Sequence, residues 1–99
     1  MSLVVPGEIL EEEFMKPLGL SQNRLALEIG VSPSAIHKLV RGKQSLTAEM
    51  ALRLSHYFGP SPQFFLNLQL LHDLDVARRD SWPRIEKYMR STSADLHAE

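Results

Sequence analysis

The clearest pattern in the chain is a pair of short apolar faces within residues 20–43. In each half of this segment, apolar side chains recur three and four residues apart, at Leu25, Ala26 and Ile29 and then at Ile36, Leu39 and Val40. This spacing places side chains on one face of an α-helix. Gly30 lies between the two runs, where glycine can end a helix in the left-handed conformation without a Cβ clash. The segment is therefore predicted to be a helix-turn-helix.

Capping residues mark where most of the predicted helices begin. A hydroxyl side chain at the N-cap accepts a first-turn N–H, and proline fits the next position because no N–H is needed there. The matching positions are Ser21, Ser32 with Pro33, Thr47, and Ser61 with Pro62. The pattern predicts an all-α fold without strands, with helices at residues 7–15, 21–30, 32–40, 48–58 and 62–79 and a short sixth helix at 83–90. The buried face of the fourth helix is expected to contain Ala51, Leu52, Ser55 and Phe58.

Residues 62–79 are apolar around most of the helix circumference, unlike the one-sided pattern of the other helices. A helix of this kind has to be buried on more than one side. A chain of 99 residues has one core, which covers one side of the helix. We therefore expect a second copy of the chain to cover the other side in a symmetric homodimer. The predicted dimer-interface residues are Phe64, Leu66, Leu70 and Leu74.

The composition narrows the classes of function. The chain has no cysteine, which excludes disulfides, thiolate zinc sites and cysteine catalysis and favours the cytoplasm as its location. The four histidines lack metal-ligand spacing, so no metal site or cofactor is expected. No apolar run is long enough to cross a membrane, and the N-terminus lacks the pattern of a signal peptide. Without a nucleophile elbow or a phosphate-binding loop, we do not expect an enzyme.

Charge is distributed unevenly along a chain whose net charge is only −1. The first predicted helix is acidic, whereas the central segment carries Arg24, Lys38, Arg41 and Lys43 against a single glutamate, Glu28. A basic helix-turn-helix favours binding to double-stranded DNA. Two alternatives remain, a solvated surface and a protein-interaction module that does not bind DNA. Because the excess charge is modest, two copies on one DNA site would strengthen binding.

The outward face of the second motif helix carries groups that suit the major groove of DNA. Lys38 can donate to guanine O6 and N7, Ser34 can pair with several base edges, and His37 can donate to a base or a phosphate. Arg41 and Lys43 at the helix end are expected to contact phosphates, which positions a protein without reading sequence. The predicted DNA-binding residues of this helix and its ends are Ser32, Pro33, Ser34, His37, Lys38, Arg41 and Lys43.

Three short motifs carry a family resemblance. They are Pro-Gly-Glu-Ile-Leu at residues 6–10, a turn motif beginning Gly-Leu-Ser-Gln at 19–22, and Phe-Phe-Leu-Asn-Leu-Gln at 64–69. In these motifs the chain resembles the HigA family, also called VapI, of helix-turn-helix antitoxins within the wider Xre/Cro repressor superfamily. The chain departs from the family at Phe65, where tryptophan is common, and at His72, where tyrosine is common. The outward residues of the second motif helix also differ, which leaves the DNA target open.

The resemblance implies a lambda-repressor-like domain of five helices that binds operator DNA as a dimer and represses its own operon. It also implies a protein partner, a HigB-type (RelE-like) toxin that cleaves mRNA, and a phosphate contact from Gln22, whose place at a helix start suits a phosphate oxygen. An Xre-family transcriptional regulator without a toxin partner is the alternative. Residues 1–90 are predicted to form the DNA-binding and dimerisation domain, and residues 91–99 a flexible tail.

Overall fold

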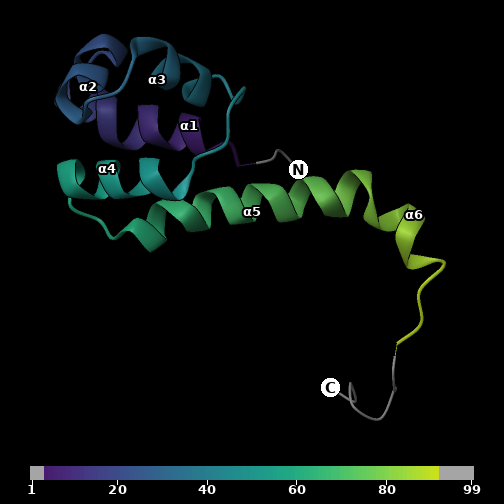
Figure 1. The fold of residues 1–99 in the computed structure, drawn as a ribbon. Coiled ribbons are helices and arrows are strands. Elements are labelled where there is room, and N and C mark those ends of the chain that lie inside the picture. The colour runs from purple at the N-terminus through teal and green to yellow at the C-terminus, as the bar shows by residue number, and fades with distance from the viewer. Residues whose placement is uncertain (1–3, 92–99) are drawn as a thin grey trace.

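The computed structural model describes residues 4–91, and these residues form helices and turns without a strand. Figure 1 shows α1 to α4 stacked on the first half of α5, whose second half runs out beyond them and ends in α6. The elements are α1 (Pro6–Ile9), η1 (Leu10–Met15), η2 (Lys16–Leu18), α2 (Gln22–Ile29), α3 (Pro33–Val40), α4 (Ala48–Phe58), α5 (Pro62–Asp80) and α6 (Trp82–Glu86). The predicted all-α fold is confirmed.

The first predicted helix is present, but it is not a uniform α-helix. After α1 the chain continues through the π-helical segment η1, where the N–H of Lys16 donates to the carbonyl of Glu11. Leu10 and Met15 are each 1% exposed, so the wider turn brings two side chains that lie five positions apart into the same core. A 3₁₀ turn, η2, follows and ends at Gly19 in the left-handed conformation.

The helix-turn-helix forms as the capping pattern predicts. The hydroxyl of Ser21 accepts a first-turn N–H of α2 at 3.0 Å, and the hydroxyl of Ser32 accepts one of α3 at 3.2 Å. Gly30 ends α2 with a φ of 74°. The caps predicted at Thr47 and Ser61 form in the same way. The positions of hydroxyl side chains therefore correctly predict where α2, α3, α4 and α5 begin.

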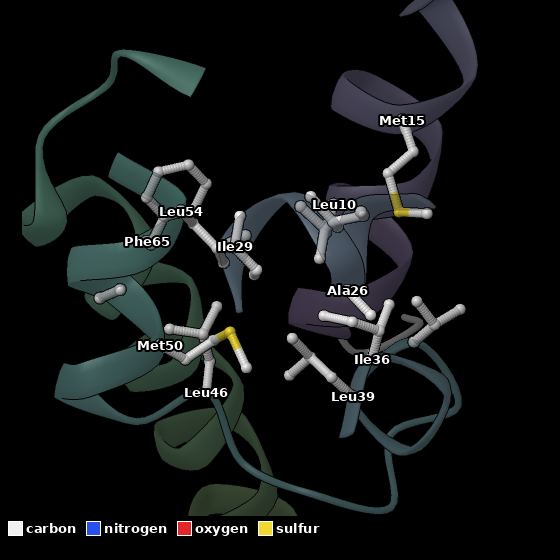
Figure 2. Close-up of a cluster of buried hydrophobic side chains, with 13 residues drawn as sticks. Leu10, Met15, Ala26, Ile29, Ile36, Leu39, Leu46, Met50, Leu54 and Phe65 are labelled. Atoms are coloured by element: carbon white, nitrogen blue, oxygen red, sulfur yellow. The ribbon is translucent and has the colours of Figure 1, made fainter. Parts of the chain in front are cut away.

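Every one of the longer helices contributes to a single hydrophobic core (Figure 2). Figure 2 shows Leu10 and Met15 facing the side chains of α2 and α3, with Leu54 and Phe65 closing the opposite side. The buried apolar residues are Leu10, Met15, Leu25, Ala26, Ile29, Ile36, Leu39, Val40, Leu46, Met50, Ala51, Leu54 and Phe65. This core fixes the position of α3 relative to the rest of the fold.

The buried face of α4 matches the prediction at Ala51 and at Phe58, which packs against the core, and differs from it at Leu52. Met50, Ala51 and Leu54 face the core, whereas Leu52 is 61% exposed. Leu52 follows Ala51 by one position, which rotates its side chain about 100° away around the helix. Both leucines suit an apolar face, and only packing against the neighbouring helices selects Leu54.

The long fifth helix was predicted with nearly correct bounds, but most of it makes little contact with the core. Phe65 is its only buried residue within the described part of the chain. Leu70, Leu71 and Leu74 are 55%, 50% and 40% exposed. The unsupported half of α5 gives the molecule its elongated shape, 53 × 23 × 22 Å.

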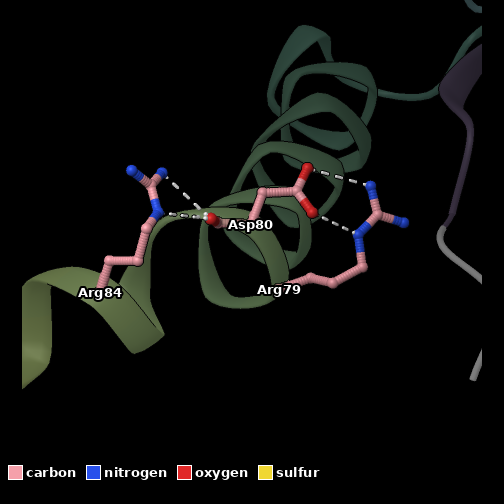
Figure 3. A network of polar contacts seen from close by, with 3 residues as sticks. All are labelled: Arg79, Asp80 and Arg84. Carbon is pink, nitrogen blue, oxygen red and sulfur yellow. Dashed lines mark hydrogen bonds and ion pairs between the residues drawn. The ribbon is translucent and has the colours of Figure 1, made fainter.

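The junction between α5 and α6 is organised around Asp80 (Figure 3). Its carboxylate accepts hydrogen bonds from Nε and Nη2 of Arg79 at 2.7 and 3.1 Å. Its backbone carbonyl accepts from the guanidinium of Arg84 at 3.1 and 3.3 Å. The hydrogen bond from Arg79 lowers the pKa of the Asp80 carboxyl below its ordinary value of 3.8.

The last helix is shorter than the predicted 83–90. It ends at Glu86, and beyond it Tyr88 and Met89 are 84% and 59% exposed. Short helices depend on packing for stability, and the described residues offer these side chains no surface to cover. Of the predicted tail at 91–99, residues 92–99 lie outside the described part of the chain.

Candidate nucleic-acid interface

The outer surface of α3 gathers most of the side chains predicted to contact DNA. The exposed members of the set are Ser32, Pro33, Ser34, His37, Lys38, Arg41 and Lys43, and Gln22 on α2 is half-buried beside them. On its inner face the same helix is anchored by Ile36, Leu39 and Val40, which are 0%, 2% and 9% exposed. Packing of these three side chains therefore fixes the position of α3, and its polar face remains exposed to solvent.

A chain of hydrogen bonds connects the start of α2 to the middle of α3. The amide Nε2 of Gln22 donates to the carboxylate of Glu11 at 3.2 Å. The amide Oε1 of Gln22 lies 3.1 Å from Nδ1 of His37, and Nε2 of His37 lies 3.4 Å from Nη1 of Arg41. We call Glu11, Gln22, His37 and Arg41 the interface polar chain. It brings together three predicted DNA-binding residues and one, Glu11, that was not predicted.

The donors and acceptors of the interface polar chain determine which ring nitrogen of His37 carries the hydrogen. A carboxylate only accepts, so the NH₂ group of Gln22 faces Glu11 and its carbonyl oxygen faces His37. Nδ1 of His37 then carries the hydrogen of its contact with Gln22, and Nε2 is left to accept from Arg41. The ring is thus oriented by groups on three different segments of the chain.

The remaining predicted contacts at α3 differ in whether their side chains already have a partner among residues 4–91. The side chains of Ser34 and Lys38 make no hydrogen bond or ion pair within this range, so their donors are available to a ligand. The Ser32 oxygen already accepts the N–H of Ala35, so its first role is to cap α3. Pro33 has no polar side-chain group and can offer only an apolar contact.

The carboxyl end of α3 turns sharply, so that both predicted phosphate-binding cations lie close to it. The N–H of Lys43 donates to the carbonyl of Lys38 at 2.8 Å, across Gly42 with a φ of 73°. Arg41 and Lys43 are therefore held at the helix end by backbone geometry. Cationic groups beside a helix that enters a groove suit phosphates on the groove edge.

Arg53 on α4 stabilises the turn between the two motif helices, a role that was not predicted from the sequence. Its Nη1 donates to the carbonyls of Ile29 at 2.6 Å and Gly30 at 3.3 Å. Its Nη2 also lies 3.5 Å from a carboxylate oxygen of Glu49. The guanidinium thereby donates hydrogen bonds to two backbone carbonyls at the end of α2 and stabilises the turn between the motif helices. No sequence pattern predicts that Arg53 contacts the end of a helix more than twenty positions earlier in the chain.

The four predicted dimer-interface residues lie on α5 in different environments. Leu70 and Leu74 are exposed. Phe64 is 40% exposed, and its ring packs against Phe14 and Phe65. Leu66 is half-buried against the core of its own chain. Leu70, Leu74 and Phe64 therefore present apolar surface that a second copy could cover, and Leu71, which is 50% exposed, adds to it.

Two further properties concern the described residues alone. Between residues 4 and 91 no group of three or more His, Asp or Glu side chains is arranged to hold a metal ion. None of the helices in this range combines the length and hydrophobicity that a membrane span requires.

Comparisons with known proteins agree with this architecture. A family profile described as helix-turn-helix matches residues 12–65, which is more than half of the chain. Virulence-associated protein I of Dichelobacter nodosus is 49% identical over 80 residues, covering 81% of this chain and 74% of that protein. A structure of the Pseudomonas aeruginosa antitoxin HigA with the higBA promoter is 34% identical, with a TM-score of 0.90, covering 93% of this chain and all of that chain. The chain belongs to the HigA/VapI family of helix-turn-helix antitoxins.

Membership of the HigA/VapI family accounts for the whole described fold. A structure of an addiction module antidote protein of the HigA family from Coxiella burnetii is 37% identical, with a TM-score of 0.87. The match covers 92% of this chain and 99% of that chain, so α5 belongs to the shared architecture as well as the motif. The family consists of DNA-binding antitoxins and regulators, not enzymes.

Proposed function

We propose that this chain is the antitoxin of a type II toxin–antitoxin pair that binds operator DNA as a homodimer and represses its own operon. We also propose that it neutralises a HigB-type toxin that cleaves mRNA. One observation carries the DNA-binding part, the exposed polar face of α3 joined by hydrogen bonds to Gln22. Because both operator DNA and mRNA are found there, we place this activity in the cytoplasm.

In the proposed complex α3 enters the major groove. Lys38, Ser34 and His37 lie on the face that meets base edges, where a lysine pairs well with guanine O6 and N7. Gln22, Arg41 and Lys43 lie beside them and contact phosphates, which set the register of the protein on the duplex. Ser32 and Pro33 approach the DNA at the start of the helix.

Dimerisation would raise the DNA affinity, which is low for a single helix-turn-helix motif with a small positive charge. A single copy presents few free cations around α3, so its affinity for DNA is modest. Pairing two copies through the exposed leucines of α5 makes the second contact intramolecular and raises the overall affinity. The two α3 helices then read half-sites about one DNA turn, roughly 34 Å, apart.

The DNA assignment is tested with the promoter region of the chain's own gene and a scrambled duplex of equal length. Lys38→Ala is expected to weaken promoter binding by about 10- to 100-fold, with a much smaller loss on the scrambled duplex. Lys43→Ala should weaken both to a similar degree and reduce the slope of log affinity against log salt by about 1. Lys87→Ala, which removes a lysine distant from α3, is the matched control. If neither Lys38→Ala nor Gln22→Ala changes binding, the groove assignment is wrong.

The dimer is tested by sedimentation of two leucine variants. Leu70→Glu places a charge on the exposed face of α5 and should yield monomers. Leu52→Glu, at a leucine on α4 that is 61% exposed, should leave the dimer intact. A folded dimer with glutamate at position 70 would show that another face forms the interface.

The toxin is tested by co-purification with the product of the neighbouring gene. A stable complex that silences an mRNA-cleaving activity supports the antitoxin role. A chain that represses its promoter and has no ribonuclease partner would instead be an Xre-family regulator without a toxin. That result would overturn the neutralisation proposal and leave the DNA-binding proposal standing.

A further inference from the structure

We propose that Glu11 is a positioning residue of the DNA interface, acting through Gln22 on the orientation of the His37 ring. The inference rests on the proposed function and deepens it, because it adds a residue outside the helix-turn-helix to the determinants of sequence preference. Glu11 does not touch the DNA in this account. It holds the groups that do.

Glu11 differs from the other acidic residues of its segment. Glu12 forms an exposed ion pair with Lys16 at 2.6 Å, and Glu13 is exposed. Glu11 is half-buried, and its carboxylate lies 3.2 Å from the Gln22 amide across the interface between η1 and α2. The π-helical segment thus presents one carboxylate of three to the start of the motif. Such segments are frequent at functional sites.

The Gln22 amide has enough donors for both Glu11 and DNA. Its NH₂ group carries two hydrogens, and one of them serves Glu11. Among the described residues the second hydrogen has no partner, so it remains available to a phosphate oxygen. The contact with Glu11 therefore prepares the amide for DNA and does not compete with it.

The same contact decides which atoms of His37 face which neighbour. With Glu11 in place, the amide oxygen of Gln22 faces Nδ1, and Nε2 of the ring is left to Arg41. Without the carboxylate, the amide is free to turn over and present NH₂ to the ring. The ring would then need a hydrogen on Nε2, where it would face the donating guanidinium of Arg41 and lose that contact. A single state of His37 becomes a mixture.

The negative charge of Glu11 acts in the opposite direction, since it repels phosphates. This repulsion crosses solvent and is screened by salt, whereas the hydrogen bond is local and half-buried. We therefore expect the positioning effect to exceed the repulsion. The glutamine variant removes the charge and keeps a carbonyl acceptor, but its NH₂ group can also donate to a turned Gln22 amide, so it restores the orientation only in part.

The test compares Glu11→Ala, Glu11→Gln and the control Glu12→Ala by fluorescence anisotropy on the promoter duplex and the scrambled duplex. Glu11→Ala should lose about 3- to 10-fold in promoter affinity and lower the ratio of promoter to scrambled affinity, the loss expected for one hydrogen bond. Glu11→Gln should lie between Glu11→Ala and the wild type in both quantities, because glutamine can pair with either orientation of the Gln22 amide, and Glu12→Ala should match the wild type. Wild-type binding by Glu11→Ala, or equal tightening by both Glu11 variants, would overturn the proposal.

A second readout in the free protein separates this inference from the proposed function. The ring ¹⁵N chemical shifts of His37 should report a hydrogen on Nδ1 in the wild type and a tautomer mixture in Glu11→Ala, with Glu11→Gln between the two. If the wild type does not distinguish promoter from scrambled DNA, the proposed function fails, and these shifts still decide whether Glu11 positions the ring. Unchanged shifts in Glu11→Ala would refute the positioning role.

Discussion

Replacing Gly7 with alanine tests how closely α3 is held against the first helix. A Cβ atom at position 7 would lie 1.9 Å from the carbonyl oxygen of Leu39 and 2.5 Å from Cα of Val40. Ordinary contact begins at 3.4 Å, so α1 and α3 would have to separate by about 1.5 Å. All of the contacted atoms belong to the backbone, so no side chain can rotate to make room.

The expected loss of stability follows from two opposing effects. Overpacking costs about 1–3 kcal/mol, and a clash with backbone belongs at the upper end of that range. Alanine recovers about 1 kcal/mol over glycine within a helix. Gly7→Ala should therefore lower the free energy of unfolding by about 2 kcal/mol and the Tm by about 10 °C, measured by circular dichroism in heat and urea.

Gly19→Ala is the control that separates lack of space from backbone conformation. Gly19 has a φ of 63°, and apart from its two neighbours in the chain no described residue has an atom within 4 Å of the position that an alanine methyl group would take there. Alanine at this position therefore costs only the left-handed conformation, about 1 kcal/mol. At a temperature where both variants are folded, only Gly7→Ala should weaken promoter binding, because it displaces α3. A Gly7→Ala protein as stable as the wild type would refute the close approach of α1 and α3.

Three further predictions concern single contacts. Ser32→Ala should cost about 1 kcal/mol in urea unfolding through loss of the α3 cap, and an equal loss in the exposed neighbour variant Ser34→Ala would contradict the cap. Arg53→Ala should cost about 1.5–3 kcal/mol in the same assay, because the carbonyl of Ile29 loses a charged donor, and full rescue by Arg53→Lys would show that charge alone suffices. The NMR-measured pKa of Asp80 should lie below 3.8 and rise towards it in Arg79→Gln. Because this pKa is lowered on folding, the contribution of the Arg79–Asp80 pair to stability is complete above the pKa of Asp80 in the unfolded chain, and it is lost as the pH falls through the pKa of Asp80 in the folded protein. An unchanged pKa in Arg79→Gln would contradict the pairing.

Local signals in the sequence predicted the parts of the fold that depend on neighbours along the chain. The Ser21 and Ser32 caps, the left-handed Gly30 and the bounds of α5 all follow from short-range geometry. The family resemblance, carried by motifs at both ends of the core, was confirmed by the comparisons. For the helix caps and the left-handed glycine, the residue responsible lies within a few positions of the helix end that it determines.

The features that the sequence did not predict arise from contacts between distant segments. Leu52 and Leu54 are equally apolar, and only the packing of α4 buries one and exposes the other. The hydrogen bonds from Arg53 to the end of α2, and from Gln22 to Glu11, join elements whose relative position is a property of the folded chain. The predicted DNA-contacting residues do share one surface, and their contacts with DNA remain predictions.

Hydroxyl-radical footprinting of the wild-type protein on its own promoter region tests the central proposal most directly. Two α3 helices in a dimer should protect two stretches of DNA whose centres lie about one helical turn apart, roughly 10 base pairs. The protection should fall sharply in Lys38→Ala at a concentration that only just saturates the wild type. A single protected stretch, or protection that Lys38→Ala leaves intact, would contradict a dimer that reads DNA through α3.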